Sequence, residues 1–541
     1  MSKSVSSWPL IGVLLVTVVT SPNITYEPFD NIKLFFLGIT AAYAIANFFA
    51  TKGNPFRSPN SWFLISLVFL LALMIPLFFT SAPFAQQFYG AAGRSLGFLH
   101  YFFLFCIFLG VAYSGDNFNF YSFVKTLVAV GLFESVYGLI QYFNLDPIAW
   151  DNSSNWVFGT FGNPNFLSAF LGLSAVVSLF VKKFSFSNLW CYLSYVNVAT
   201  CLIVIFISDS IQGLFIFGIG VSLLIQYIAF LRSKIFGFTV TLLSSITSVF
   251  VAFGVFGKGT LGKYLYQDST TFRGDYWRAG LQMFKDNLLT GVGLDSYGDN
   301  YRFYRDSISA NRRGLDLYST SAHNIYLDLA STGGIFVIFT FLTFSLSILF
   351  VGFISLKKSK FKSIDMAVLL VLWLAFQAQL LISINVSSVA IWGFVIGGLI
   401  VRNKLTSGEV QKSKNSVQKS QILRKSNLYK LVFVPLFMFM VFPLLLRDIQ
   451  LARAISNSSK DNLIAATTSW PTSCYYLAKT EEALSQVQDF PSSLSVSKRS
   501  VSINSKCFDS WRHIYDNPEA SEVEKEGAWE RMKELDPNLS K

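Results

Sequence analysis

One polar segment, residues 257–333, gathers arginines and a histidine between long apolar runs of this 541-residue chain. Arginine suits a diphosphate, because its planar guanidinium donates two parallel hydrogen bonds and stays ionised even near hydrocarbon. Histidine has an ordinary pKa of about 6.5, so a neutral imidazole can accept the proton of a hydroxyl group. The segment therefore predicts a site for a lipid-linked anion. It contains, in chain order, Arg273, Arg278, Arg302, Arg305, Arg312, Arg313 and His323.

Arg273 is the first candidate for a diphosphate ligand, and Arg302 and Arg305 are the second candidates. The alternative for Arg273 is a surface ion pair with Asp275 or another aspartate of the loop, but exposed pairs contribute only about 0 to 1 kcal/mol. The other three arginines of the segment are expected to be solvated or to contact lipid head groups.

Composition places the chain in a membrane. Hydrophobic residues make up 52% of it, 56 residues are Phe and only 14% are charged, and the mean hydropathy is +0.47. Such a small share of polar residues excludes a soluble globule of this size. About thirteen apolar runs approach the roughly 20 residues that cross a hydrocarbon core. The predicted fold is all-α, with about 12–13 transmembrane helices and a small helical carboxyl-terminal domain.

The apolar runs divide the chain into six regions. The first run, residues 8–20, is interpreted as a span rather than a cleaved signal peptide, since Val19-Thr20-Ser21 is a poor cleavage site. The predicted regions are transmembrane helices 1–9 in residues 1–256, a site-bearing loop in 257–333, helices 10–12 in 334–401, a basic cytoplasmic linker in 402–428, helix 13 in 429–446 and a helical tail in 447–541.

Positive charge falls on alternate loops, and loops rich in Lys and Arg stay in the cytoplasm. This places the 257–333 loop and the 447–541 tail on the extracytoplasmic side of the membrane. The net charge of +12 is then explained by anchoring at anionic lipid head groups and indicates no nucleic-acid partner. The positive loops include Lys52 with Arg57, Lys182 with Lys183, Arg232 with Lys234, and Lys357 to Lys362.

The tail has the spacing of short amphipathic helices, which resemble degenerate tetratricopeptide hairpins, and it is a candidate surface for a protein partner. Cys474 and Cys507 are its two cysteines. In an oxidising exterior they either pair as a disulfide or remain thiols, and the sequence favours neither outcome. The other three cysteines lie in apolar runs, where buried packing is expected: Cys106, Cys191 and Cys201.

Three motifs follow one another along the chain. They are Gly159-Thr160-Phe161-Gly162-Asn163-Pro164-Asn165-Phe166-Leu167; Arg273 with Trp277, then Asp286-Asn287 and Gly291-Val292-Gly293; and Ala322-His323-Asn324-Ile325-Tyr326-Leu327 ahead of Gly333-Gly334. In this order they resemble the O-antigen ligase and O-antigen polymerase superfamily of bacterial multi-span membrane glycosyltransferases. The resemblance covers roughly residues 30–400 and implies the C-type glycosyltransferase architecture.

Pro164 pushes Asn163 out of helical geometry, so the first motif forms a turn. Either its backbone amides face the site, or the turn only connects the end of one helix to the start of the next. The resemblance implies that His323 is catalytic, as a base or by positioning the acceptor, and the alternative is a helix-capping or core histidine. Supporting roles are expected for Asn163, Asn165, Trp277 and Asn324.

One position departs from the family. Where the family has a Ser-Arg-Gly sequence whose arginine is thought to bind donor phosphate, this chain reads Ser210-Ile211-Gln212-Gly213. Gln212 lacks the charge and is expected to act only as a neutral hydrogen-bond donor. Either Arg273 holds the diphosphate together with Arg302 or Arg305, or the donor differs.

The resemblance implies a transfer reaction at the outer face of the cytoplasmic membrane. A glycan leaves a polyprenyl-diphosphate carrier and joins a hydroxyl of a glycan or protein acceptor, without a cofactor or a metal. Asp295 and Asp299 are accordingly expected to pair with arginines rather than bind a cation. Two alternatives stay open: a protein O-oligosaccharyltransferase, which differs only in the acceptor, and a flippase for lipid-linked oligosaccharide, for which intramembrane charge such as Glu134 is sparse.

Overall fold

The computed structural model describes residues 8–52, 60–114, 120–150, 157–184, 186–314, 316–408, 416–457 and 459–539. Within these ranges every regular element is a helix and no strand occurs, so the predicted all-α class is confirmed. Long apolar runs fold in this way because backbone N–H and C=O groups in hydrocarbon have to be paired within their own segment.

Nine helices of the described ranges are long and apolar enough to cross a membrane. They are α2 (Asp30–Lys52), α3 (Ser61–Phe79), α6 (Phe120–Tyr142), α7 with the 3-10 turn η1 (Pro164–Ser178 and Val181–Lys183), α8 (Asn188–Ile207), α9 (Ile211–Arg232), α10 (Lys234–Val255), α15 (Ile325–Lys358) and α18 (Ser416–Asn457). The other predicted spans form helices with shorter apolar stretches: α1 (Trp8–Val18), α5 (Phe98–Ala112), α16 (Ile364–Leu380) and α17 (Ser387–Gly408).

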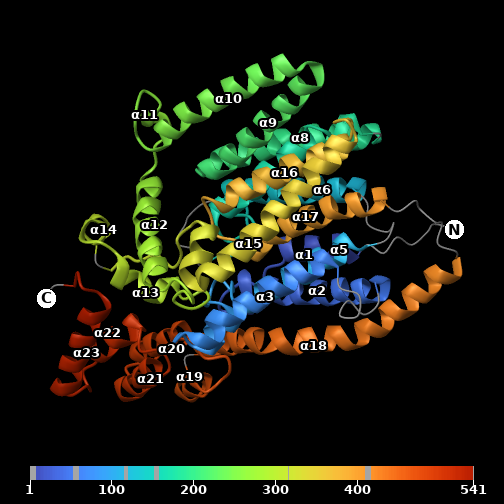
Figure 1. Ribbon diagram of the computed structural model, residues 1–541. Helices are drawn as coiled ribbons and strands as arrows, with labels where there is room; N and C mark the ends of the chain where they lie inside the picture. The colour runs from blue at the N-terminus through green and yellow to red at the C-terminus, as the bar shows by residue number, and fades with distance from the viewer. Residues whose placement is uncertain are drawn as a thin grey trace.

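The long helices lie side by side, and the remaining helices gather mostly at one end of the bundle, on the left in Figure 1. The turns that follow α9 and α15, which carry Arg232, Lys234 and Lys357, lie at the other end. The bundle thus separates basic turns from the predicted site. The remaining helices are α4 (Phe84–Tyr89), α11 (Gly262–Leu265), α12 (Asp268–Asp286), α13 (Tyr297–Tyr304), α14 (Ser307–Arg313), α19 (Lys460–Thr467), α20 (Cys474–Gln486), α21 (Phe490–Ile503), α22 (Phe508–Asp516) and α23 (Glu522–Leu535).

The core of the bundle is centred on α5 and α17, whose described side chains are almost all buried. Aromatic rings fill it: the centroid of Phe105 lies 4.6 Å from that of Phe344 and 5.2 Å from that of Phe394. By contrast α10 lies at the edge and is largely exposed, as expected of a helix whose apolar surface faces lipid.

The predicted basic linker is partly helical. α17 continues to Gly408 and α18 begins at Ser416, so residues 402–408 and 416–428 extend these two helices. Arg57 and residues 409–415, on which the predicted orientation and linker also depend, lie outside the described residues.

The tail is a compact group of helices in which α20 packs against α21 and α22 against α23. Cys474, at the start of α20, forms a disulfide with Cys507, the N-cap of α22, and their Cα atoms are 5.8 Å apart. The tail is also fastened to the membrane helices, since Nδ2 of Asn31 in α2 donates to Oη of Tyr476 at 3.1 Å.

Candidate active site

One face of α12 is apolar and packs into the loop. Tyr276, Ala279 and Met283 recur at helical spacing and are buried in a cluster with Tyr297 and Tyr301 of α13. Oη of Tyr297 donates to the backbone carbonyl of Tyr276 at 2.6 Å. This packing fixes α12 in place.

Arg273 lies one turn before Trp277 on α12, so their side chains share one edge of the helix. Nε of Arg273 and Nε1 of Trp277 are buried and have no hydrogen-bond partner in the described part of the chain, while Nη1 of Arg273 is 3.5 Å from Oγ of Ser269. Burial lowers the pKa of Arg273 from its ordinary value. Buried donors without acceptors are unfavourable, so this edge suits an anion that supplies oxygen atoms.

His323 is held against the same helix. Its imidazole stacks on the ring of Tyr276, with centroids 5.5 Å apart and planes inclined by 29°. Its backbone has φ of 50°, a left-handed conformation that is uncommon for residues other than Gly, although Asn, Asp and His adopt it more often than most. Its amide donates to Oγ of Ser321 at 3.2 Å. Thus Arg273 is a residue of α12, and His323 contacts the same helix through the ring of Tyr276.

The second and third motifs are joined through a break in α15. The backbone of Gly334 is non-helical, with φ of 78° and ψ of −174°. The amides of Val292 and Gly293 donate to the carbonyls of Ser331 and Thr332 at 2.9 and 3.1 Å. The Gly291-Val292-Gly293 turn therefore occupies carbonyls that the break leaves free, and it fixes the first turns of α15 beside α12.

Gly334→Ala is expected to destabilise the protein by about 1 to 3 kcal/mol or more, because this backbone conformation is nearly restricted to glycine and a Cβ atom would collide with the carbonyl oxygen of Leu289. The measurement is the thermal unfolding midpoint in detergent. Gly218→Ala is the matched control, because a Cβ atom at that helical position meets nothing within 4 Å. An unchanged midpoint for Gly334→Ala would contradict the break.

Arg302 and Arg305 contact the tail. Both guanidinium groups pair with Asp536, which directly follows α23. The side chain of Arg302 is 7% exposed, that of Arg305 is 1% exposed and that of Asp536 is 0% exposed. Cζ of Arg302 lies 4.1 Å from the ring centroid of Phe508 in α22, and Nη1 of Arg305 donates to the carbonyl of Leu317 at 3.0 Å. In this structure the two arginines hold the tail on the loop, and their predicted contact with the donor stays a prediction.

Further polar contacts join α13 and its surroundings to the tail. Oδ2 of Asp299 accepts from Nδ2 of Asn504 at 3.0 Å and from Nε2 of Gln86 in α4 at 2.9 Å. Nζ of Lys506 donates to Oδ1 of Asn300 at 2.7 Å. Asp299, for which the sequence predicted an arginine partner, instead connects α13 to α4 and to the tail through amide side chains.

The other loop arginines are paired with acids. Arg278 contacts Asp275 and Asp306 at 2.7 and 2.9 Å, and Arg312 contacts Asp275 at 2.7 Å. The side chain of Arg313, the last residue of α14, lies outside the described part of the structure. The ion pair that the sequence proposed as an alternative for Arg273 is instead made by Arg278 and Arg312.

Side chains inside the bundle bind the turn of the first motif. The amides of Phe158 and Gly159 donate to Oε1 of Gln141 at 3.1 and 2.7 Å. The amide of Thr160 donates to Oε2 of Glu134 at 3.1 Å. These three amides are therefore engaged within the protein, which favours the interpretation of the turn as a structural connection.

The predicted supporting residues cap helices or cross-link them. Oδ1 of Asn163 accepts from the amide of Asn165 at 2.9 Å, and Oδ1 of Asn165 accepts from Oγ of Ser210 at 2.8 Å. Oδ1 of Asn324 caps α15. Gln212 is 1% exposed and its amide donates to the carbonyl of Ile382 at 2.9 Å, so the available contact is to the backbone, and a contact with the donor stays a prediction.

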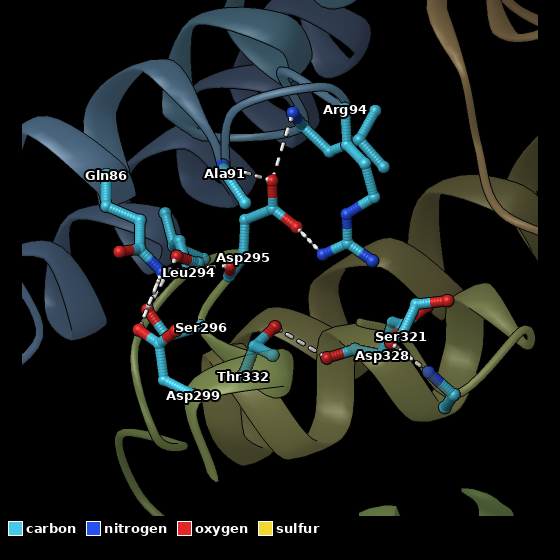
Figure 2. A network of polar contacts seen from close by, with 12 residues as sticks. Gln86, Ala91, Arg94, Leu294, Asp295, Ser296, Asp299, Ser321, Asp328 and Thr332 are labelled. Atoms are coloured by element: carbon cyan, nitrogen blue, oxygen red, sulfur yellow. Dashed lines mark hydrogen bonds and ion pairs between the residues drawn. The ribbon is translucent and has the colours of Figure 1, made fainter. Parts of the chain in front are cut away.

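Sequence reasoning missed Arg94, which lies between α4 and α5. Figure 2 shows its guanidinium paired with Asp295, on the turn after Gly293, with Asp328 of α15 nearby. The expectation that Asp295 pairs with an arginine is met by an arginine from a distant part of the chain. A signal was present: Arg94 is a lone charge in the glycine-rich break Gly90–Gly97 between two apolar runs, and such charges at a membrane border are often functional.

Within the described ranges, no group of three or more His, Cys, Asp or Glu side chains is placed to hold a metal ion. The expectation of metal-independent chemistry stays a prediction.

Residues 157–342 match the family model described as O-Antigen ligase. The match contains the turn of the first motif, all of α12 and the His323 turn. It ends before the tail, whose likeness to tetratricopeptide repeats stays a prediction. No curated protein matches the chain.

Proposed function

We propose that this multi-pass membrane protein uses its O-antigen ligase domain to transfer a glycan from a polyprenyl-diphosphate carrier to an acceptor hydroxyl, as a surface polysaccharide ligase or polymerase. The observation that carries the proposal is the edge of α12. It offers the buried, unpartnered Nε of Arg273 and Nε1 of Trp277 next to Tyr276, which supports His323. A cation for the leaving group and a base for the acceptor are thus brought to one helix.

The reaction needs few groups. The acceptor oxygen attacks the anomeric carbon of the donor glycan, and the bond between that carbon and the diphosphate oxygen breaks with its electron pair leaving on the diphosphate. The hydroxyl proton passes to His323. Arg273 offsets the charge that grows on the leaving diphosphate, which is the kind of interaction that lowers a transition-state barrier most.

The proposed side of the membrane is the extracytoplasmic face of the bacterial inner membrane. Its support is the separation of basic turns from α12 across the bundle (Figure 1), since basic turns remain in the cytoplasm. Reagent accessibility of a single cysteine placed on the exposed end of α12 tests this orientation in intact cells.

Arg273→Ala is expected to lower the rate of glycosidic bond formation by about 100- to 1000-fold, the usual effect of removing one group that stabilises developing negative charge. The assay supplies purified protein with radiolabelled polyprenyl-diphosphate oligosaccharide and with glycan or peptide acceptors. Arg278→Ala is the matched control on the same helix, because its side chain is 54% exposed and already paired.

Equal turnover of the Arg273 and Arg278 variants would remove Arg273 from the site. Transfer to peptide alone would indicate a protein O-oligosaccharyltransferase. Flipping of the donor without a new glycosidic bond would indicate a transporter, although the one acid of α6, Glu134, is bound to Thr160 and so serves the turn of the first motif.

A further inference from the structure

A buried polar cluster lies beside the turn that carries His323. Arg94 pairs with Asp295 (Figure 2), and both residues line a cavity of about 20 Å³ together with Asp328. The side chains of Arg94 and Asp295 are 12% and 4% exposed. The carboxylate of Asp328 lies within electrostatic reach of both. One guanidinium therefore faces two carboxyl groups.

Asp328 connects this cluster to the histidine turn. Its Oδ1 accepts a hydrogen bond from the amide of Ala322 at 2.8 Å. Ala322 directly precedes His323, so the bond ties the backbone of the histidine to the first turn of α15, six residues further along the chain.

The imidazole of His323 stacks on Tyr276 of α12, and two further sets of hydrogen bonds at the turn are local. The amide of His323 donates to Oγ of Ser321 at 3.2 Å, and the amides of Tyr326 and Leu327 donate to Oδ1 of Asn324 at 3.1 and 3.2 Å. The bonds to Asn324 cap α15 and the bond to Ser321 shapes the histidine turn, but none of these three bonds joins the turn to the helix. A left-handed histidine persists only where surrounding contacts determine its backbone, and the bond from Ala322 to Asp328 contributes to that constraint together with the stacking on Tyr276.

We propose that Asp328 is a positioning residue for His323 and that Arg94 keeps the Asp328 carboxylate in place. The inference rests on the proposed function and adds residues from outside the three motifs. Nε and Nη1 of Arg94 have no hydrogen-bond partner among the described residues, so they remain available to the cavity that Asp328 shares. Without Arg94, two carboxylates would face one another across a space for a single water molecule.

A pair of substitutions separates the hydrogen bond from the charge. Asp328→Asn keeps an oxygen that can accept from the Ala322 amide, and it is expected to lower kcat by less than about threefold. Asp328→Ala removes the acceptor and is expected to lower kcat by about 10- to 100-fold, the range for a slightly misplaced catalytic group, with the donor KM unchanged. Arg94→Gln is expected to lower kcat by an intermediate factor.

The second readout is amide hydrogen exchange of peptides that cover residues 319–328, which needs no turnover. Exchange is expected to rise in Asp328→Ala and to stay at the wild-type rate in Asp328→Asn. Asp365→Ala is the matched control, because Asp365 occupies the first turn of α16 at the other end of the bundle.

Unchanged exchange in Asp328→Ala would overturn the inference, and so would an Asp328→Asn variant that loses as much kcat as Asp328→Ala. A wild-type protein that forms no glycosidic bond, but whose turn loosens in Asp328→Ala, would overturn the proposed function and leave the positioning role of Asp328 supported.

Discussion

Replacement of His323 by asparagine is expected to lower kcat for glycan transfer by about two to four orders of magnitude, the usual contribution of a positioned acid or base. Asparagine is chosen because it tolerates the left-handed backbone that His323 adopts, with φ of 50°. The substitution therefore removes the proton acceptor and leaves the turn in place. Single-turnover formation of the glycosidic bond, followed at saturating donor and acceptor, measures the effect.

The control for this prediction is His513→Asn in α22, a partly exposed histidine in the tail. It is expected to retain wild-type turnover. If His323→Asn kept kcat within a few-fold of wild type, His323 would not accept the proton, and a solvent molecule or another residue would have to take it. If kcat were kept but the acceptor KM rose, His323 would bind the acceptor without reacting.

The helices were predictable from the sequence because hydrocarbon imposes their length and composition. The same reasoning placed the start of the tenth span at residue 334, whereas α15 begins at Ile325 and breaks at Gly334. The nine residues before the break are polar enough to be read as loop. They are helical because Asn324 caps them and because the Gly291–Gly293 turn takes up the carbonyls at the break.

The candidate site was predictable where its members are close in sequence. Arg273 and Trp277 are one helical turn apart, so the spacing alone places them together. The fate of Arg302 and Arg305 was not predictable, because their partner Asp536 lies more than 230 residues away and reaches them only when the tail folds over the loop. Arg94 was missed for the same reason, since Asp295 is 201 residues distant. Charge identifies candidates, but tertiary pairing decides which of them stay open to a ligand.

Asp536→Asn is expected to detach the tail from the loop and to destabilise that contact by about 3 to 5 kcal/mol, because it leaves two buried guanidinium groups without their carboxylate. Arg302 and Arg305 both pair with Asp536, whose side chain is fully buried. Protease sensitivity of the segment between α18 and α19, and amide hydrogen exchange of α13, measure the detachment. Asp316→Asn is the matched control. The side chain of Asp316, which pairs with Arg512, is 79% exposed, and exposed ion pairs contribute about 0 to 1 kcal/mol.

The same variant decides what Arg302 and Arg305 do. If they serve the tail, Asp536→Asn and Arg305→Ala give the same phenotype: faster exchange in α13, with kcat lowered through a loosened α12. If they bind the donor, Arg305→Ala raises the donor KM and Asp536→Asn does not. The burial of both arginines under α22 and α23 favours the first outcome. Among the three predicted diphosphate ligands, Arg273 is then the one whose guanidinium is not already paired with an acid of the described chain. A tail outside the matched domain would then be needed to keep α13, and through Tyr297 also α12, in the geometry that transfer requires.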